Sequence, residues 1–368
     1  MAYDQEKVVS AIQAFERGEV LVVRDDDDRE NEGDLIVSAV HCTEEKMAFI
    51  IRHTSGIVCA PMSKEEAKRL GLTPMVCDND AVHGTQFTVS VDYKYGITTG
   101  ISAYDRALAV RNLANFNACA HDFARPGHIF PLIAHEEGVL LRSGHTEAAV
   151  DLCKLAHLPP VGVIGELVND DGSIKHGDEV TKFAQDNRLH LITVADLIAY
   201  RQRKEMIIQQ VGAMQIETSI GSAVAQSYKL PWEMLQHIAI VFGDIHEGED
   251  IPVCFYHENI INDIFGQSSN MIIMMQHMVE KEKRGVCVYL RKKSVDVQSC
   301  IGDQVMEISE LEKHGQAVKR GEEWQKSGLG AQILKSLGIR SVIVYAFKGN
   351  DDVDLESFGI RISKIHTL

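Results

Sequence analysis

The pattern of apolar and polar residues predicts alternating helices and strands over about the first 205 residues. Near the N-terminus, Val8, Ile12 and Phe15 recur at helical spacing, and the apolar run Val20–Val23 that follows is typical of a buried strand. Further along, residues 86–93 alternate apolar and polar positions in the manner of a half-buried strand. This succession of strands and helices predicts a layered α/β or α+β domain.

Capping signals predict where several helices begin. A side-chain oxygen that can accept a backbone N–H stands before four helix-like stretches, at Thr43, Ser63, Ser102 and Thr193. Residues 138–147 are interpreted as a strand, a glycine turn and the start of a helix that runs to about His157. Further strands are predicted at residues 161–168 and 189–193, and further helices at residues 178–187 and 194–204.

A charged and then polar stretch at Arg201–Gln210 is interpreted as a linker, which predicts two domains at residues 1–205 and 211–368. The second half again mixes strand-like and helix-like stretches, so we expect a second αβ unit. Its predicted strands lie at residues 238–242, 253–256, 285–289 and 341–347, and its predicted helices at about 264–283, 303–318 and 328–337.

The charge balance and the cysteine usage argue against several classes of protein. The 368 residues carry a formal net charge of −16, so a broad surface for nucleic acid or anionic membrane is not expected. The eight cysteines are scattered, without the spacing of a zinc knuckle or a redox motif. No apolar run reaches the length of a membrane span, and the N-terminus lacks a basic and then apolar signal region. We therefore expect a reduced, cytoplasmic protein with no nucleic-acid or membrane partner.

The acidic segment Asp25–Asp34, directly after the first predicted strand, is the strongest candidate for chemistry. Seven of its ten residues are carboxylates, and Arg29 is its single cation. Crowded carboxylates repel one another, and a divalent cation such as Mg²⁺, which prefers oxygen ligands, would relieve that repulsion. Gly33 permits the backbone geometry of a tight loop around a small ligand. The alternative, a solvated acidic loop, stays open at this point.

A second candidate is the turn that carries His145. An imidazole and a carboxylate from separate segments can share one divalent metal, and carboxylate-rich sites favour Mg²⁺ or Mn²⁺. His145 stands at a predicted helix start with Arg142 and Thr146 beside it, an arrangement typical of a phosphate-binding turn. The alternative is that His145 is a structural residue.

Two further residues are candidates for proton transfer. His128 follows a Pro-Gly pair that we interpret as a turn, and an imidazole there can exchange protons near neutral pH. The alternative is a residue that only stiffens the loop. Glu166 is expected at the centre of an otherwise apolar strand, where burial would raise its pKa. Its alternative is a charge on the solvent face of an edge strand.

Four motifs taken together resemble 3,4-dihydroxy-2-butanone 4-phosphate synthase, the enzyme that supplies the four-carbon unit of riboflavin. They fall in order over roughly residues 5–203, at residues 25–34, 98–106, 125–132 and 142–148. The resemblance implies a layered αβ fold, a sugar-phosphate substrate, and conversion of ribulose 5-phosphate to the butanone phosphate plus formate. It further implies Mg²⁺ or Mn²⁺ as the cofactor, with two ions per site, and a homodimer with the site near the subunit interface.

The resemblance also assigns roles to individual residues. Those implied to bind the substrate are Arg29, Glu30, Asp34, Arg142, Ser143, Gly144, His145, Thr146 and Glu166. Within this set, Glu30 and His145 would hold the metal. The four residues around His145 would bind the phosphate. His128 and Glu166 would be essential for turnover, and Glu32 would share in the proton transfers.

The second half resembles GTP cyclohydrolase II on shorter motifs, among them His257-Glu258 and the stretch 330–334. That enzyme needs three cysteines for its zinc, and residues 257–270 contain none. We therefore expect no zinc and interpret residues 211–368 as a degenerate cyclohydrolase-like domain. Two alternatives remain open: a bifunctional enzyme that also hydrolyses GTP, and a non-catalytic binding protein in which both halves have decayed.

Overall fold

The computed structural model describes residues 4–259, 263, 270–292, 314–347 and 354–368. The chain divides into two compact units. The first comprises Met1–Arg201 with Ser309–Ala317, and the second comprises Gln202–Ile308 with Val318–Leu368. Each unit is built on one mixed sheet of seven strands. The expectation of two αβ units is confirmed.

The sheet of the first unit contains both parallel and antiparallel neighbours. Its strands, in spatial order, are β4 (Val91–Tyr93), β5 (Phe123–Ile133), β3 (Cys59–Met62), β6 (Gly162–Glu166), β2 (Gly33–Ser38), β1 (Leu21–Arg24) and β7 (His190–Thr193). Strand β1 is antiparallel to β2 and parallel to β7, and β2 is antiparallel to β6. The acidic segment, which connects β1 to β2, and Glu166, the last residue of β6, therefore lie at the same end of these three strands.

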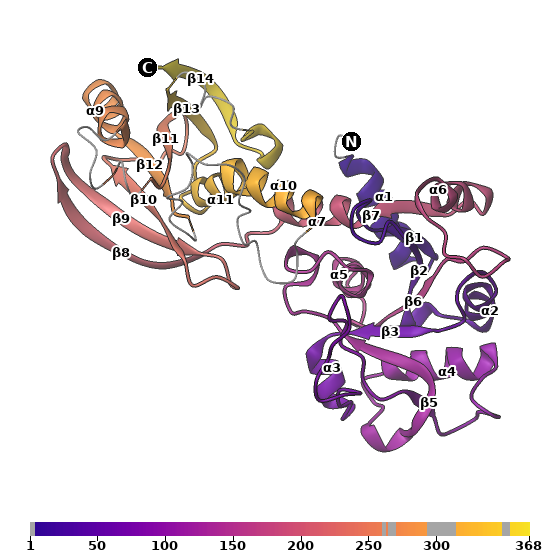
Figure 1. The fold of residues 1–368 in the computed structure, drawn as a ribbon. Helices are drawn as coiled ribbons and strands as arrows, with labels where there is room; N and C mark the ends of the chain where they lie inside the picture. The colour runs from indigo at the N-terminus through magenta and orange to yellow at the C-terminus, as the bar shows by residue number, and fades with distance from the viewer. Residues whose placement is uncertain (1–3, 260–262, 264–269, 293–313, 348–353) are drawn as a thin grey trace. The chain divides into compact units, whose positions relative to one another are not determined.

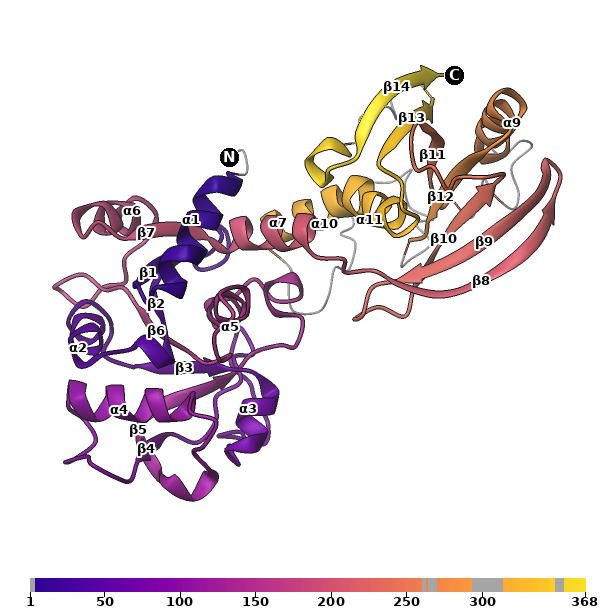
Figure 2. The same cartoon turned by 180° about the vertical axis from the view of Figure 1, so that it is seen from behind.

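Helices cover both faces of this sheet (Figures 1 and 2). They are α1 (Gln5–Glu16), α2 (Glu44–His53), α3 (Lys64–Arg69), α4 (Ala103–Leu113), α5 (His145–Leu155), α6 (Gly177–Asp186) and α7 (Val194–Lys204). Alternate residues of β1 serve the two cores: Val22 packs with α2, α4 and α6, whereas Leu21 and Val23 pack with α1, α5 and α7. This two-sided burial explains why the strand reads as a continuous apolar run rather than an alternating one.

Several helix starts occur where the capping residues predict them. The side chains of Thr43, Ser63 and Ser102 accept backbone N–H bonds at the starts of α2, α3 and α4. The Thr193 hydroxyl accepts from the Asp196 amide, and the Asp196 carboxylate accepts from the Thr193 amide. These local side-chain bonds satisfy N–H groups that have no partner inside the helix.

Three predictions in the first unit are wrong. Residues 138–142 form no strand, because Gly138–Leu140 is the 3₁₀ turn η3 that leads to α5. Only Val91–Tyr93 of the stretch 86–93 is strand β4. The Pro-Gly pair before His128 is not a turn: it lies within β5, with a cis bond between Arg125 and Pro126.

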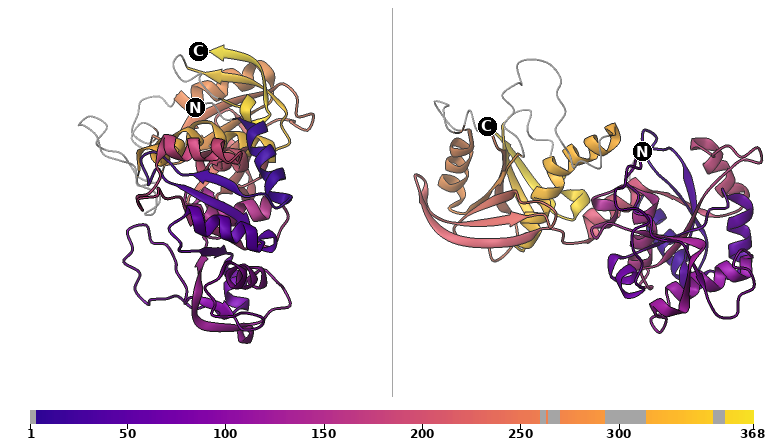
Figure 3. Two further views of the ribbon diagram at one scale, coloured as in Figure 1. Left: turned by 90° about the vertical axis from the view of Figure 1, so that its right-hand side faces the viewer. Right: turned by 60° about the horizontal axis from the view of Figure 1, so that its bottom comes forward.

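The second unit has its own sheet and helices. The strands, in spatial order, are β14 (Arg361–Thr367), β13 (Ser341–Ala346), β11 (Ile251–His257), β12 (Gly285–Leu290), β10 (Gln236–Phe242), β9 (Gly221–Lys229) and β8 (Gln209–Thr218). The helical segments are α9 (Asn270–Glu282), α10 (Gly315–Glu323, of which the second unit contains the part from Val318), η4 (Trp324–Gly328) and α11 (Leu329–Ser336). Helix α9 lies against the sheet (Figure 3). Its Met274, Met275 and Met278 side chains form one buried cluster with Phe242 of β10.

Sequence reasoning was less complete here. Strands β10 to β13 and helix α11 occur close to their predicted positions, but β8, β9 and β14 were not predicted. The predicted linker 201–210 is shorter in the structure, because α7 continues to Lys204 and β8 begins at Gln209. Most of the predicted helix 303–318 lies outside the described residues, as do residues 264–269 of the helix predicted at 264–283. Within the described ranges, no helix is both long and apolar enough to span a membrane.

Candidate active site

The acidic segment is folded around one buried carboxylate, that of Asp25. It accepts hydrogen bonds from the backbone amides of Glu30 (3.2 Å) and Glu32 (2.9 Å) and from Nη1 of Arg29 (2.8 Å). These bonds close the loop between β1 and β2. Sequence reasoning did not single out Asp25 among its acidic neighbours, because the pattern shows how many carboxylates there are but not that Asp25, Asp26 and Asp34 are the buried ones.

Asp25, Glu30 and His145 form a group that could hold a metal ion. Each offers one ligand atom, and the three atoms lie within 4.8 Å of one another. Nδ1 of His145 lies 4.0 Å from Oε2 of Glu30 and 3.8 Å from Oδ1 of Asp34. Nε2 of His145 and Oδ1 of Asp34 are buried without a hydrogen-bond partner among the described residues. The structure thus brings together the two predicted metal ligands, and this set of carboxylates and an imidazole suits Mg²⁺ or Mn²⁺.

The pKa values of this cluster reflect its crowded negative charge. Burial, together with the charges of Glu166, Glu30 and Asp25, raises the pKa of Asp34 to about 7, although His145 opposes the shift. Burial also raises the pKa of Glu32, and the Glu30 and Glu166 carboxylates add to the effect. Burial lowers the pKa of His145, but the Asp34 and Asp25 carboxylates outweigh it, so this pKa lies above its usual value. A bound divalent cation would reduce the repulsion among these carboxylates, which contributes to the raised pKa values.

The predicted phosphate turn begins helix α5, with Gly144 as its N-cap. The Arg142 guanidinium is buried and donates to Oε2 of Glu147 (2.6 Å), to Oγ1 of Thr85 (3.0 Å) and to the His83 carbonyl. A Cβ atom at Gly144 would lie 2.4 Å from Nη1 of Arg142, so only glycine leaves room for this arrangement. The helix N-terminus and the fixed guanidinium are features that favour an anion.

His128 pairs with Asp92, a residue that sequence reasoning missed. The carboxylate of Asp92, on β4, lies 2.7 Å from Nδ1 of His128 and accepts the His128 backbone amide at 2.9 Å. An ionised Asp92 fixes the proton on Nδ1 and leaves Nε2 as the proton acceptor. Among the described residues, the His128 ring forms its polar contacts with Asp92 alone, so the structure does not join it to the acidic cluster.

Glu166 lies beside the acidic cluster, but not as expected. It faces Asp34 in the antiparallel register of β2 and β6. It is the last residue of β6 and is exposed, so the predicted burial at a strand centre is wrong. The alternative of an edge strand is also wrong, because β6 lies between β3 and β2. The carboxylate stands at the open end of a central strand, where a substrate can reach it.

A segment from late in the sequence belongs to the first unit and meets the same loops. Nδ1 of His314 lies 3.0 Å from Oδ1 of Asp28, and Nε2 lies 3.3 Å from Oγ of Ser143. The Gln316 amide donates to Oδ2 of Asp28 at 2.8 Å. These bonds from Gln316 and His314 outweigh the effect of burial and lower the pKa of Asp28. Sequence reasoning missed His314 because nothing near residue 314 indicates contact with residues almost three hundred positions away.

The comparisons with known proteins agree with this geometry. Residues 9–200 match the family model of 3,4-dihydroxy-2-butanone 4-phosphate synthase, and residues 209–367 match that of GTP cyclohydrolase II. The chain belongs to the 3,4-dihydroxy-2-butanone 4-phosphate synthase family. It is therefore a lyase of riboflavin biosynthesis that carries a GTP cyclohydrolase II domain behind its synthase domain.

Two relatives from Arabidopsis thaliana cover nearly the whole chain. The chain is 42% identical to the chloroplastic monofunctional riboflavin biosynthesis protein RIBA 2, over 97% of this chain and 75% of that protein. It is 40% identical to the chloroplastic bifunctional riboflavin biosynthesis protein RIBA 1, over 96% of this chain and 67% of that protein. Overall similarity therefore does not decide between one activity and two.

Two solved structures are similar as well. A 3,4-dihydroxy-2-butanone 4-phosphate synthase in complex with two magnesium ions is 47% identical, with a TM-score of 0.52 over 54% of this chain and 97% of that one. RibBX, a two domain synthase from A. baumannii, is 30% identical, with a TM-score of 0.70 over 98% of this chain and 99% of that one. The second match supports the order and folds of both domains.

The cyclohydrolase II domain shows a different arrangement at the end of β11. Glu258 accepts from Nε of Arg291 (3.1 Å) and from the Lys292 amide (3.0 Å). The side chains of Tyr256 and Tyr289 stack and both donate to Asp263. Within the described residues, Asp25, Glu30 and His145 form the one potential metal-binding cluster, so this domain contributes none.

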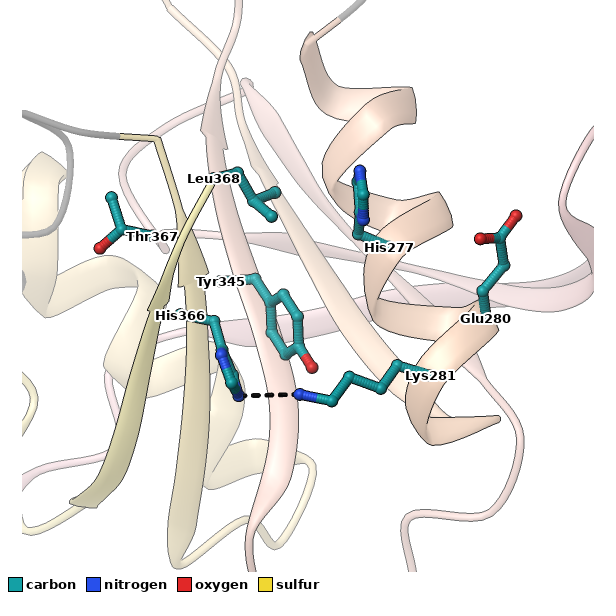
Figure 4. Close-up of a pocket in the computed structure, with 7 residues that line it drawn as sticks. All are labelled: His277, Glu280, Lys281, Tyr345, His366, Thr367 and Leu368. Atoms are coloured by element: carbon teal, nitrogen blue, oxygen red, sulfur yellow. Dashed lines mark hydrogen bonds between the residues drawn. The ribbon is translucent and has the colours of Figure 1, made fainter.

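The cyclohydrolase II domain also contains an open pocket of about 420 Å³, formed by one face of α9 and the strands β13 and β14. Lys281 reaches across it, with its Nζ atom 3.1 Å from Nε2 of His366, and the His366 ring packs on Tyr345 (Figure 4). None of the residues around Glu258 lines this pocket. It is thus distinct from the region that resembles the cyclohydrolase site.

Proposed function

We propose that the synthase domain, residues 1–205, converts D-ribulose 5-phosphate to L-3,4-dihydroxy-2-butanone 4-phosphate and formate. The observation that carries the proposal is the cluster of Asp25, Glu30 and His145, in which His145 also begins the helix whose N-terminus forms the phosphate turn. A metal-binding group and an anion-binding turn thus share one residue. A phosphorylated sugar matches both features, because its adjacent oxygen atoms can bind the metal and its phosphate can bind the turn.

Glu30 offers a carboxylate oxygen and His145 an imidazole nitrogen, and these are donor atoms suited to a divalent cation such as Mg²⁺ or Mn²⁺. Nε2 of His145 and Oδ1 of Asp34 are buried without a hydrogen-bond partner among the described residues, and crowding by neighbouring carboxylates adds to burial in raising the pKa of Asp34. When bound, the cation would supply Lewis-acid stabilisation of negative charge on substrate oxygens. The synthase structure with two magnesium ions supports two ions per site here.

The remaining residues bind the substrate and move protons. The turn Arg142–Thr146 binds the phosphate, and Arg29 and Asp34 contact the sugar. His128, with its Nδ1 proton fixed by Asp92, accepts and returns protons through Nε2. Glu166 and Glu32, beside the acidic cluster, exchange further protons. Butanone phosphate and formate together contain every atom of ribulose 5-phosphate, so the reaction needs proton transfer and rearrangement but no oxidant.

We further propose that the protein acts as a homodimer with its site near the subunit interface. The acidic cluster and the Asp92–His128 pair are not joined by any polar contact among the described residues. Several large apolar side chains of the synthase domain are exposed, among them Ile57, Val76 and Val82. Exposed apolar patches on a soluble protein often mark an interface.

We propose that the second domain, residues 211–368, does not hydrolyse GTP and holds no zinc. Both carboxylate oxygens of Glu258 are engaged by residues 291 and 292, and Asn259 stands in the stretch without cysteine. The monofunctional plant relative supports this proposal, whereas the bifunctional one favours a second activity. The alternative is therefore a bifunctional enzyme.

One pair of incubations tests these proposals. With Mg²⁺ and ribulose 5-phosphate, we expect formate release that stops with EDTA and returns with added Mg²⁺. With GTP, we expect no consumption and no stoichiometric zinc by metal analysis. Absence of formate from the folded, metal-loaded protein would refute the synthase proposal and favour a non-catalytic binding protein. GTP consumption with bound zinc would establish the bifunctional alternative.

A further inference from the structure

Asp105 is a buried carboxylate that fastens the loop before its own helix. It lies in the first turn of α4 and is 1% exposed. Its carboxylate accepts from the Thr98 amide (3.0 Å), the Thr98 hydroxyl (2.7 Å) and the Gly100 amide (3.0 Å). These bonds outweigh the effect of burial and keep the pKa of Asp105 below its usual value. Its partners Thr98 and Gly100 lie seven and five residues earlier in the chain, so the carboxylate orders the loop before α4 rather than the helix itself.

The loop that Asp105 holds lies directly against the Asp92–His128 pair. Gly100 adopts φ +91°, and a Cβ atom there would lie 2.2 Å from Oδ2 of Asp92 and 2.6 Å from Nδ1 of His128. Those two atoms are the ones joined in the 2.7 Å contact between carboxylate and imidazole. The backbone at Gly100 therefore sets one wall of the space in which this contact forms.

We propose that Asp105, acting through Gly100, positions the Asp92–His128 pair and so sets the orientation and proton affinity of the His128 imidazole. The proposal rests on the proposed function, in which His128 transfers protons. Asp105 and Gly100 are positioning residues, since Asp105 holds Gly100 and Gly100 lies against the pair.

A positioning role and a merely structural role predict different results. If Asp105 only stabilised the fold, its loss would lower the melting temperature and leave the folded enzyme's kinetics and His128 titration unchanged. If it positions His128, the folded variant should show a lower kcat, an almost unchanged KM and a displaced His128 titration. The metal ligands lie on other elements, so Mn²⁺ binding should not change.

The experiment compares Asp105→Asn and Gly100→Ala with Thr43→Ala in the full-length protein. Asp105→Asn replaces one acceptor oxygen with a donor facing N–H or O–H groups. Gly100→Ala inserts a methyl group between Asp92 and His128. Thr43→Ala is the matched control, because it removes a capping bond from α2 and leaves the 98–105 loop intact. The measurements are formate release against pH, Mn²⁺ binding, and the NMR titration of the His128 ring in folded protein.

We expect about a tenfold or larger fall in kcat for both test variants, since general acid–base catalysis typically contributes about 10²–10⁴-fold. KM and Mn²⁺ affinity should stay within about twofold, and the control should match the wild type. An unchanged His128 titration in folded Asp105→Asn and Gly100→Ala would overturn the inference. If Asp105→Asn does not fold, Thr98→Val, which removes only the hydroxyl bond, must show the same titration change in smaller degree. The titration needs no turnover, so failure of the synthase activity and failure of this inference are distinguishable.

Discussion

Both units place carboxylates at the ends of the strands of a seven-stranded sheet, but they differ in how these groups are paired. In the first unit, Oδ1 of Asp34 and Nε2 of His145 are buried without partners among the described residues. In the second, each oxygen of Glu258 accepts a bond. Buried polar atoms are normally paired, and an exception needs a reason. The comparison teaches that two units with similar arrangements of sheets and helices can differ in how completely the polar groups at their strand ends are paired.

The largest expected effect comes from removing a predicted metal ligand. Glu30→Gln or His145→Ala should lower formate production by at least about a hundredfold, because metal-ion catalysis contributes several kcal/mol and each 1.4 kcal/mol is a factor of ten. Mn²⁺ titration followed by electron paramagnetic resonance should show weaker binding in the same variants. Full activity in either variant would contradict the metal assignment. Glu258→Gln is the matched substitution in the second unit.

The next largest effect is expected at the Asp92–His128 pair. Asp92→Asn keeps the shape of the side chain but removes the charge that fixes the His128 tautomer. We expect kcat to fall by about a hundredfold, within the range typical of general acid–base catalysis. Mn²⁺ binding should match the wild type. If metal affinity fell together with kcat, the pair and the acidic cluster would not be the separate parts described above.

A smaller effect concerns stability and its dependence on pH. The pKa of Asp34 is raised from 3.8 to about 7, so between these values the folded, metal-free protein keeps a proton that the unfolded chain has lost. Its contribution therefore destabilises the fold increasingly as pH rises from about 4 to 7. Asp34→Asn should thus gain about 2 kcal/mol more in unfolding free energy at pH 7 than at pH 5, relative to wild type.

Urea denaturation of the metal-free protein at both pH values measures this difference. Asp186→Asn is a suitable control, because Asp186 is exposed on α6 and, in the part of the chain that the structure describes, pairs with Lys182 alone. An equal gain for Asp34→Asn at pH 5 and pH 7 would contradict the raised pKa. Saturating Mg²⁺ should reduce or reverse the gain, since the cation compensates the charge in the wild type.

The smallest effect on catalysis is expected in the second unit. Glu258→Gln breaks the pairing with Arg291 and the Lys292 amide. It should lower the melting temperature, because it weakens hydrogen bonds to a largely buried carboxylate. Formate release should stay within about twofold of the wild type at a temperature where both units are folded. A large loss of formate release would show that this region serves the synthase reaction, and the contrast between the units would fail.

The sequence predicted local features well and partnerships across the fold poorly. Ser102 and Thr193 could be read as helix starts because a cap and its partner lie within three residues. Asp92 could not be paired with His128, because their contact depends on β4 lying beside β5. The apolar run after Gly138 was taken for a strand, since a short apolar run cannot distinguish a strand from a buried turn.

The same limits explain the missing strands and the partly predicted site. Strands β8 and β9 are rich in glutamine, glycine, serine and alanine, and β8 is largely exposed while β9 is mostly half-buried, so they show little apolar alternation. Glu30 and His145 were predicted as metal ligands because each stands in a conspicuous motif, and the structure brings the two side chains together, which leaves their role a prediction. Nothing in the sequence around Asp25 or His314 indicates which residues they contact, so their part in the site is visible only in the structure.

The register that sets Asp34 opposite Glu166 has a consequence for how the chain tolerates change. Side chains alternate between the two faces of a sheet, so inserting one residue within β2 or β6 would send every later side chain of that strand to the wrong side. Such an insertion would abolish the site while leaving each of its loops intact in sequence. The exposed turn at residues 169–173 should accept added residues far more readily, and it is where engineered insertions in this enzyme belong.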